Sequence, residues 1–418
     1  MEGGSPASDK RLLVLGAGPA QLGLLEAAHD GGLYVIAVDR DPLAPGFRFA
    51  DRRAIVSVED EPAIDRLAAA ERVDGVIAPG IDFPVAIAAR VAARLGLPHP
   101  LDAATAQVAT SKLRQRERFA AAEVPHARDR VCASLSEASA AAEELGFPCV
   151  VKAPDLQGQK GLGLVPGAEA LPQAFDLARG LSRSSVVLVE EHVAGPEVTV
   201  NGFSVGGRFH PLTVTDRVVS DPPAFGVALA HVWPSRLPEE TLAEVVRVAE
   251  AAAAAVGVQD GPTYTQVLVG ENGPRVGELA ARLGGGHDAE LCEAALGVHL
   301  NALAISAALG ERLYDGAFVP DELAGGACVR FLVPEPGVLE LVEGLEAAER
   351  SNGVVWVRSY REPGYELGKL RRGADRAGAV LTVGDSRKQA MDRARRAASK
   401  VRFVTADVAV ESPAASRP

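Results

Sequence analysis

Two lysines stand where a phosphate-binding site could form. Lys112 opens a helical segment, and Lys152 directly follows the apolar residues 149–151. A lysine after three apolar strand residues must leave the sheet or meet an anion, because a buried ammonium group without a partner is costly. Residues 157–163, which follow soon after, contain three glycines and Lys160. Glycines let backbone N–H groups approach phosphate oxygens closely, so the pattern predicts an anion site. A solvated lysine beside a hairpin loop is the alternative, since the segment is not a Walker loop.

Acidic residues follow the next apolar strand. Glu190 and Glu191 come directly after the sequence VVLV, and Glu197 follows a Gly-Pro turn. A carboxylate only accepts hydrogen bonds, and it therefore suits ribose hydroxyls or an exocyclic amine. The three acids could border a nucleoside pocket. Exposed acids at the end of a strand are the alternative interpretation.

A third group of residues could serve metal and phosphoryl chemistry. Glu278 and Ala280 share one face of a strand by the two-residue period, and Gln266 on the preceding strand is expected to pair near Glu278. Carboxylate and amide oxygens are ligands that Mg²⁺ takes beside nucleotide phosphates. Arg282 precedes three consecutive glycines and could reach a transferring phosphoryl group. An arginine before glycines is otherwise an ordinary loop residue.

A glycine turn near the N-terminus raises a second possibility for nucleotide binding. Gly16 and Gly18 follow an apolar strand, and Asp39 ends the next strand at the place of a ribose-binding acid. A dinucleotide fingerprint requires a third glycine where Gln21 stands. The incomplete pattern favours a tight turn in a domain that binds no dinucleotide.

The candidate site residues must be positioned by a folded framework. The pattern of the first hundred residues predicts a parallel sheet. Apolar strands and amphipathic helices alternate there, which is typical of a parallel sheet with helices on its faces. Strands are expected at 11–16, 33–39, 54–58 and 75–78, with helices at 20–30, 61–71 and 83–95.

Mixed strands and helices continue in a second and a third unit. A helix over 111–124, with its charges on one face, begins the second unit; strands are expected near 129–133, 147–154, 185–193, 197–205 and 208–217, two more within 263–286, and helices at 136–145, 168–180 and 238–257. A third unit of strands and a final helix starts near residue 325. We expect an α/β and α+β protein with domains at 1–108, 109–310 and 311–410.

The order of these motifs resembles the ATP-grasp superfamily over residues 100–310. The shared pattern is a lysine helix, a strand-end lysine, a glycine-rich loop, E-E-x-V-x-G-x-E and E-x-x-A-R-x-G-G-G. The segment ELAARLGGGHDAEL and the small C-terminal unit look most like the L-amino acid ligase branch, which joins a carboxylate to an amine. The resemblance implies an open parallel α/β domain, an ATP-grasp domain of two subdomains with the nucleotide between them, and a small C-terminal domain that completes the substrate site.

The resemblance also implies a role for each motif residue. Lys112 and Lys152 would hold the α- and β-phosphates, and Gln157, Gly158, Lys160 and Gly161 would close over the β- and γ-phosphates. Adenine would meet the Glu190, Glu191 and Val193 segment, while Glu197 would meet the ribose. Glu278 and Gln266 would bind Mg²⁺, and Arg282 would be the catalytic residue. His231, His287 and Asp288 are candidate substrate contacts, with ordinary polar residues as the alternative.

The implied reaction joins an acid and an amine at the expense of ATP. A substrate carboxylate attacks the γ-phosphoryl group, and an amine then attacks the acyl-phosphate, which releases ADP and phosphate. Two residues depart from the family pattern: Gln266 replaces an acid, and Ala280 replaces a frequent Asn. The number of bound metal ions is therefore left open.

Three other interpretations stay open. The same fold could use bicarbonate or a phosphoribosyl amine, as carboxylases and purine-pathway ligases do. The departures at Gln266 and Ala280 also allow a nucleotide-binding protein without catalysis. A nicotinamide oxidoreductase is disfavoured by Gln21.

Composition narrows the class of protein. The 418 residues carry a formal net charge of −12, which argues against binding to nucleic acid or an anionic membrane surface. Four widely spaced cysteines predict neither a zinc cluster nor a disulfide framework. The polar start MEGGSPASDKR lacks the apolar region of a secretory signal, and no apolar run is long enough to span a bilayer. We expect a cytoplasmic enzyme that acts on small molecules, and the resemblance implies a homodimer.

Overall fold

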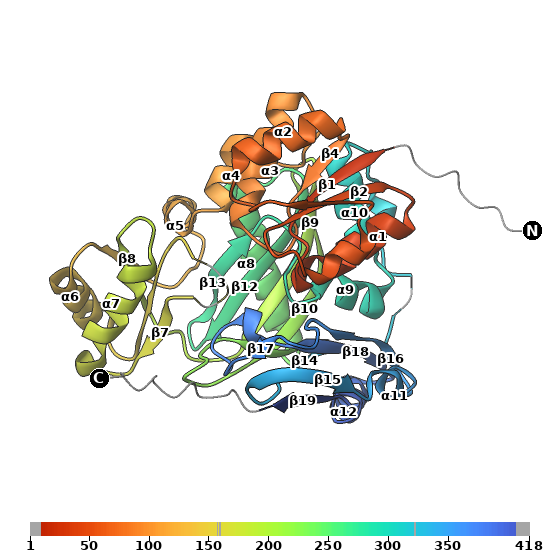
Figure 1. Cartoon of the computed structure of the whole chain (residues 1–418). Helices are drawn as coiled ribbons and strands as arrows, with labels where there is room; N and C mark the ends of the chain where they lie inside the picture. The colour runs from red at the N-terminus through yellow and green to blue at the C-terminus, as the bar shows by residue number, and fades with distance from the viewer. Residues whose placement is uncertain (1–9, 157, 159, 322, 407–418) are drawn as a thin grey trace, which may run out of the picture.

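The computed structural model describes residues 10–156, 158, 160–321 and 323–406. These residues form four β-sheets with helices packed between and around them (Figure 1). An N-terminal parallel sheet, a central antiparallel region and a smaller C-terminal part make up the chain, which confirms the expected fold class.

The N-terminal unit is a four-stranded parallel sheet. Its strands, in spatial order, are β3 (Arg52–Ile55), β2 (Tyr34–Asp39), β1 (Arg11–Leu15) and β4 (Gly75–Ile77), and its helices are α1 (Leu22–Asp30), α2 (Glu61–Glu71) and α3 (Phe83–Leu95). Helices on the faces bury the sheet on both sides, which explains its continuous apolar runs. The expected alternation is confirmed, although β3 lies at residues 52–55 rather than 54–58.

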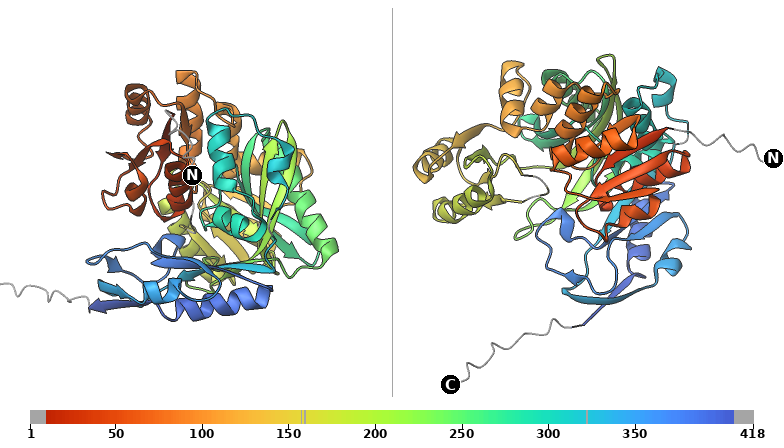
Figure 2. Two further views of the ribbon diagram at one scale, coloured as in Figure 1. Left: turned by 90° about the vertical axis from the view of Figure 1, so that its right-hand side faces the viewer. Right: turned by 45° about the horizontal axis from the view of Figure 1, so that its top comes forward.

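A small antiparallel sheet forms a separate lobe. Its strands, in spatial order, are β5 (Asp129–Cys132), β8 (Val187–Glu191), β6 (Cys149–Lys152) and β7 (Leu162–Val165), and its helices are α6 (Leu135–Leu145) and α7 (Leu171–Leu181). In Figure 1 and the right-hand view of Figure 2 this lobe projects to the left, away from the rest of the molecule. Helices α4 (Ala103–Ala109) and α5 (Lys112–Ala121) connect it to the N-terminal unit.

The largest sheet has eight antiparallel strands. Its spatial order is β13 (Gly273–Ala280), β12 (Gly261–Gly270), β9 (Glu197–Val205), β10 (Arg208–Val219), β11 (Ala228–Trp233), β14 (Gly326–Leu332), β18 (Gly378–Gly384) and β16 (Val354–Ser359). Strand β11 pairs with β14 through four residue pairs. The C-terminal strands therefore continue the central sheet across the expected boundary at residue 310.

The two faces of this sheet differ in chemistry. Helices α8 (Glu239–Val256) and α12 (Arg387–Ala398) pack on one face, where the buried residues are small and apolar. The other face meets α1, α9 (Asp288–Leu296) and α10 (Leu300–Ala308) and carries a row of polar residues. In that row Glu278 is opposite Gln266, and Arg217 is opposite His231. Cross-strand partners point to the same side, so the functional groups expected from the sequence share one face.

A third small sheet closes the C-terminal part. It contains β17 (Glu366–Leu367), β15 (Gly337–Glu343) and β19 (Arg402–Ala406), with α11 (Leu345–Glu349) nearby. In the left-hand view of Figure 2 the C-terminal elements lie along the bottom of the molecule. Among the described residues, no helix has the length and apolar character needed to cross a membrane.

Candidate functional site

A cavity of about 320 Å³ lies between the small lobe and the polar face of the eight-stranded sheet. Ten of the residues singled out in the sequence line it: Lys112, Lys152, Gly158, Lys160, Glu190, Glu191, Val193, Glu197, Gln266 and Glu278. Gln157 lies outside the described residues, whereas Gly161, Arg282, His231, His287 and Asp288 do not line this cavity. The fold thus gathers residues from five separate motifs into one place.

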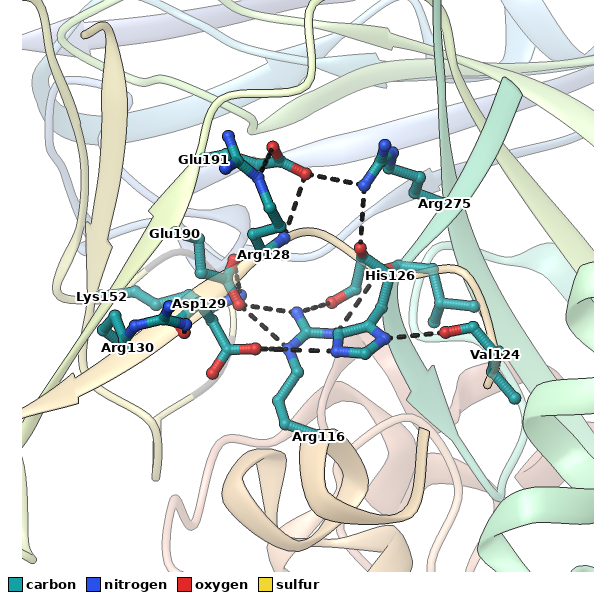
Figure 3. A network of polar contacts seen from close by, with 12 residues as sticks. Arg116, Val124, His126, Arg128, Asp129, Arg130, Lys152, Glu190, Glu191 and Arg275 are labelled. Carbon is teal, nitrogen blue, oxygen red and sulfur yellow. Dashed lines mark hydrogen bonds and ion pairs between the residues drawn. The ribbon is translucent and has the colours of Figure 1, made fainter. Parts of the chain in front are cut away.

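Glu190 is held between two cations at the wall of the cavity (Figure 3). Its carboxylate accepts a hydrogen bond of 2.6 Å from Nη2 of Arg116 and lies 2.6 Å from Nζ of Lys152. Burial opposes ionisation of Glu190, but Arg116 and Lys152 outweigh it and lower the pKa of the carboxyl. Burial and the positive charge of Arg116 lower the pKa of Lys152, although Glu190 opposes that shift. An anionic group placed beside Lys152 would favour its charged form.

The neighbouring Glu191 has a structural role in this geometry. Its carboxylate accepts hydrogen bonds from Nε of Arg128 at 2.7 Å and Nη1 of Arg275 at 2.9 Å, as Figure 3 shows. Arg275 lies on β13 of the large sheet, so Glu191 joins the small lobe to that sheet. The carboxylates of Glu190 and Glu191 are engaged by cations, which leaves the backbone of this segment as the part available to a base.

Lys112 and Glu278 form a second ion pair in the cavity. Their charged atoms lie 2.9 Å apart, and Lys112 also donates to the carbonyl of Leu156 at 2.8 Å. Burial favours the neutral carboxyl, yet Lys112, Lys152 and Arg282 lower the pKa of Glu278 to about 2. Burial likewise acts against the charge of Lys112, but Glu278 and Asp82 raise the pKa of this lysine. Both groups are therefore charged at neutral pH.

Glu197 and Gln266 complete the wall beside Glu278. Gln266 lies directly across the β-ladder from Glu278, as the two-residue period predicts. Its amide nitrogen donates to Glu197, which also pairs with Arg217. The side-chain oxygen of Gln266 remains as an acceptor.

The donor set suits a magnesium ion that is shared with a nucleotide. The described residues contain no cluster of three His, Cys, Asp or Glu residues that could hold a metal ion. Glu278 provides one ionised carboxylate, and Gln266 stands opposite it with an amide oxygen. Mg²⁺ is commonly bound through one or two carboxylates together with substrate phosphates, so this set fits nucleotide-bound Mg²⁺.

Arg282 lies just beyond β13 and pairs with Asp82 of the N-terminal unit. Nη2 of Arg282 is 2.5 Å from Oδ1 of Asp82, and Nη1 donates to the carbonyl of Leu283 at 2.8 Å. Asp82 lines a second cavity, of about 370 Å³, that shares Lys112 and Glu278 with the first. The two cavities therefore meet at the Lys112–Glu278 pair, and Asp82, the ion-pair partner of Arg282, lines the second one.

The three candidate substrate contacts lie deeper in the molecule. Nδ1 of His231 is 2.8 Å from Oδ1 of Asp288, and both side chains are buried. Nε2 of His287 shares a hydrogen bond of 2.5 Å with the hydroxyl of Tyr360, and Nδ1 of the same ring lies 2.9 Å from the carboxylate of Glu290. The structure thus separates a His231–Asp288 pair from His287, whose ring nitrogens are both engaged by the protein.

The N-terminal glycine turn is packed by its own residues. The buried side chain of Gln21 lies against Gly16 and donates to the carbonyl of Pro79 at 2.6 Å. A carboxylate oxygen of Asp39 accepts a hydrogen bond of 2.9 Å from the backbone N–H of Ala17. The groups that a dinucleotide would need are therefore used within the fold.

Three charged residues of the site were missed in the sequence. Arg116 and Arg217 neutralise Glu190 and Glu197, and Asp82 holds Arg282. Arg116 lies one helical turn after Lys112, so the i, i+4 spacing on the charged face of α5 could have indicated it. Arg217 and Asp82 lie in segments without any motif, and only the three-dimensional contacts reveal them.

Comparisons with known proteins agree with this geometry. Residues 111–315 match the family model of the carbamoyl-phosphate synthase L chain, ATP binding domain, and residues 330–406 match that of L-amino acid ligase C-terminal domain 2. The solved L-amino acid ligase from Bacillus licheniformis has a TM-score of 0.81 at 21% identity, and the alignment covers 96% of this chain and 99% of that one.

Two curated proteins illustrate the relatives found by sequence. The uncharacterized protein y4rH from Sinorhizobium fredii is 28% identical over 389 residues, which cover 90% of this chain and 79% of that protein. The formate-dependent phosphoribosylglycinamide formyltransferase from Pyrococcus abyssi is 29% identical over 250 residues, 58% of each chain. The alignment thus spans little more than half of that formyltransferase. Together with the fold and the matched ATP-binding domain, these similarities show that the chain belongs to the ATP-grasp superfamily.

Proposed function

We propose that this protein is an ATP-dependent carboxylate–amine ligase that joins amino acids or related small acids and amines through an acyl-phosphate. The observation that carries the proposal is the meeting of two cavities at the Lys112–Glu278 pair, with Arg282 and Asp82 beside the second cavity. A nucleotide in the first cavity would place its terminal phosphate next to a space for an acid.

In this proposal the lysines and Glu190 bind the nucleotide. Lys112 and Lys152 neutralise its phosphates, and residues 190–193 present backbone groups to the base. Glu197 accepts hydrogen bonds from the ribose, and Arg217 fixes the orientation of its carboxylate. Both lysines are already neutralised by ion pairs with Glu278 and Glu190. When ATP binds, each lysine would exchange part of its contact with a carboxylate for a contact with phosphate oxygens.

Phosphoryl transfer depends on charge neutralisation and alignment. Glu278 and Gln266 would hold Mg²⁺, which supplies charge neutralisation to the phosphates when it is bound. Arg282 would leave Asp82 in part to stabilise the transferred group. The acid enters through the second cavity, and the small lobe excludes water from the acyl-phosphate.

A matrix of acids and amines with ATP tests this proposal. The expected result is release of ADP and phosphate only when a suitable acid and a suitable amine are both present. Mass spectrometry of the product should show an amide. The proposal would be wrong if none of the tested acid–amine pairs, amino acids and simple acids and amines included, released phosphate.

A second candidate is a purine-pathway type of ligase. The similarity to a formate-dependent phosphoribosylglycinamide formyltransferase favours it, because formate is also a carboxylate and the acceptor in that name is an amine. Formate with a phosphoribosyl amine, and bicarbonate alone, therefore belong in the same matrix. Turnover in only those wells would replace the amino-acid assignment, and tight ATP binding with no turnover anywhere would favour the non-catalytic alternative.

A further inference from the structure

The buried pair of His231 and Asp288 has the geometry of an oriented base. The relative exposure is 2% for His231 and 0% for Asp288, and Nδ1 of the ring lies 2.8 Å from Oδ1 of the carboxylate. The other oxygen of Asp288 accepts a hydrogen bond of 3.1 Å from the backbone N–H of Gly286. Nδ1 and Oδ1 lie at an ion-pair distance without hydrogen-bond alignment, and a carboxylate beside Nδ1 favours a proton on that nitrogen, which leaves the lone pair to Nε2.

The second ring nitrogen of His231, Nε2, has no polar partner in this arrangement of the described residues. It is buried and has no hydrogen-bond partner within the described part of the chain. The ring meets Phe331 edge-on, with 5.7 Å between ring centroids, and that contact supplies no polar atom. An unsatisfied buried nitrogen destabilises the folded protein, because it loses its hydrogen bonds to water. A ligand that donates a hydrogen bond to Nε2 would remove that cost.

The glycine run after Arg282 is built around this pair. A Cβ atom at Gly284 would clash with the carboxylate of Asp288 and with the ring of Tyr264. A Cβ atom at Gly286 would clash with the imidazole of His231. The two glycines allow the loop to bring Asp288 against His231, so the segment that begins with Arg282 ends in the carboxylate of the pair.

The pair also lies on the functional face of the sheet. His231 is opposite Arg217 in the β10–β11 ladder, and Arg217 lines the nucleotide cavity. Asp288 also lies close to Tyr264, because a Cβ atom at Gly284 would touch both side chains. The pair therefore shares a sheet face with Arg217, which lines the nucleotide cavity.

We propose that His231 is the general base for the amine in the second half of the reaction and that Asp288 is its positioning residue. This inference rests on the proposed ligase function. The amine nitrogen uses its lone pair to form the C–N bond, and the bond from the acyl carbon to the phosphate oxygen breaks with its electron pair on phosphate. The amino acid arrives as an ammonium ion and loses two protons. The first goes to Nε2 of His231 and from there to water, which frees the lone pair of the nitrogen, and the second goes to the released phosphate.

Hydroxylamine separates the two halves of the reaction. It is a neutral nucleophile at pH 7.5 and traps an acyl-phosphate as a hydroxamate without needing a base, whereas an amino acid arrives as an ammonium ion. The experiment measures hydroxamate and amide formation side by side in the natural protein, His231→Gln and Asp288→Asn, with the acid and amine that give the most phosphate release. His299→Gln, at an exposed histidine paired with Glu293, is the matched control.

The expected result is a selective loss in the second half. His231→Gln should lower amide formation by about 10²-fold or more, as loss of a general base does, and hydroxamate formation by less than about threefold. Asp288→Asn should show the same selectivity, and His299→Gln should change neither rate.

Two results would overturn the inference. Equal losses of hydroxamate and amide in His231→Gln, or no loss of either, would assign the pair a structural role or none. If His231→Gln does not fold, the ratio of the two products in Asp288→Asn decides the question. Absence of hydroxamate from the natural protein with every acid would instead refute the proposed ligase function itself.

Discussion

Two regions of the molecule carry glycine-rich patterns that could bind a nucleotide, and the structure treats them oppositely. At the N-terminal turn, Gln21 packs against Gly16 and Asp39 accepts from the backbone. In the central cavity, cations and acids face one another across about 320 Å³ of space. Glycines permit close approach in both regions, but only the second surrounds a space with charges. The lesson is that a glycine pattern locates a turn, while the partners of the nearby charges show whether a ligand can enter.

The largest expected effect breaks the charge network of the central cavity. Arg116→Ala leaves the buried carboxylate of Glu190 with Lys152 alone, and removing one partner of a buried pair costs about 3–5 kcal/mol. Urea unfolding followed by circular dichroism measures the loss. Arg130→Ala removes an exposed pair with Glu144 and should cost less than about 1 kcal/mol. Similar losses in the two variants would show that the Glu190 network contributes no special stability.

A slightly smaller effect is expected at the reaction step. Arg282→Ala should lower turnover by about 10²–10³-fold, the usual consequence of losing one donor to a developing charge. ATP affinity, measured by titration calorimetry, should stay within about twofold, because Arg282 does not line the first cavity. Arg282→Lys keeps a charge beside Asp82 and controls for folding. A large loss of ATP affinity in Arg282→Ala would show that Arg282 binds the nucleotide rather than acting only in the reaction step.

ATP binding itself distinguishes the two regions directly. Lys152→Met should weaken ATP binding by about tenfold, since it removes a cation from the cavity wall. Asp39→Asn, in the N-terminal turn, should leave ATP affinity unchanged. Calorimetric titration of both variants makes the comparison. Equal weakening would mean that ATP uses the N-terminal turn.

The smallest effect tests the filled turn. Gln21→Gly completes the dinucleotide fingerprint in the sequence but removes a buried side chain and its hydrogen bond to Pro79. We expect a loss of about 1 kcal/mol in stability and no binding of NADH. Thermal unfolding and NADH fluorescence check the two parts. NADH binding by this variant would contradict the view that the turn serves only the fold.

The sequence predicts the fold best where local periodicity dominates. Helices α2 and α3 have the expected bounds, 61–71 and 83–95, because their apolar stripes and end residues are local signals. Helices α9 and α10 were not expected. Helix α10 is apolar nearly all round, since the large sheet and the N-terminal unit both cover it, and it shows little periodicity. Strand β7 was missed because its first two residues belong to the glycine-rich segment 157–163.

The site follows the same division. Motif spacing identified Lys112, Lys152, Glu190 and Glu278, and the structure brings them into one cavity. Arg116 and Glu190 are 74 residues apart in sequence, so their pairing depends on how α5 packs under the small lobe. The sequence places the charges of α5 on one face, but it does not show that Arg116 is buried. Long-range pairing of this kind leaves no periodic trace in the sequence.

The separation of the four-stranded lobe from the eight-stranded sheet has a mechanical consequence. The C-terminal strands are hydrogen-bonded into the large sheet and cannot rotate without bending it. The small lobe is held near the cavity by the buried Arg116–Glu190 pair and the Glu191–Arg275 pair, and elsewhere by the exposed Arg183–Glu59 pair. Exposed pairs contribute little, so the least costly large motion is a hinge rotation of the lobe that opens the Arg183 end. For the proposed ligase, the open position of the lobe would serve nucleotide exchange and the closed position would serve water exclusion.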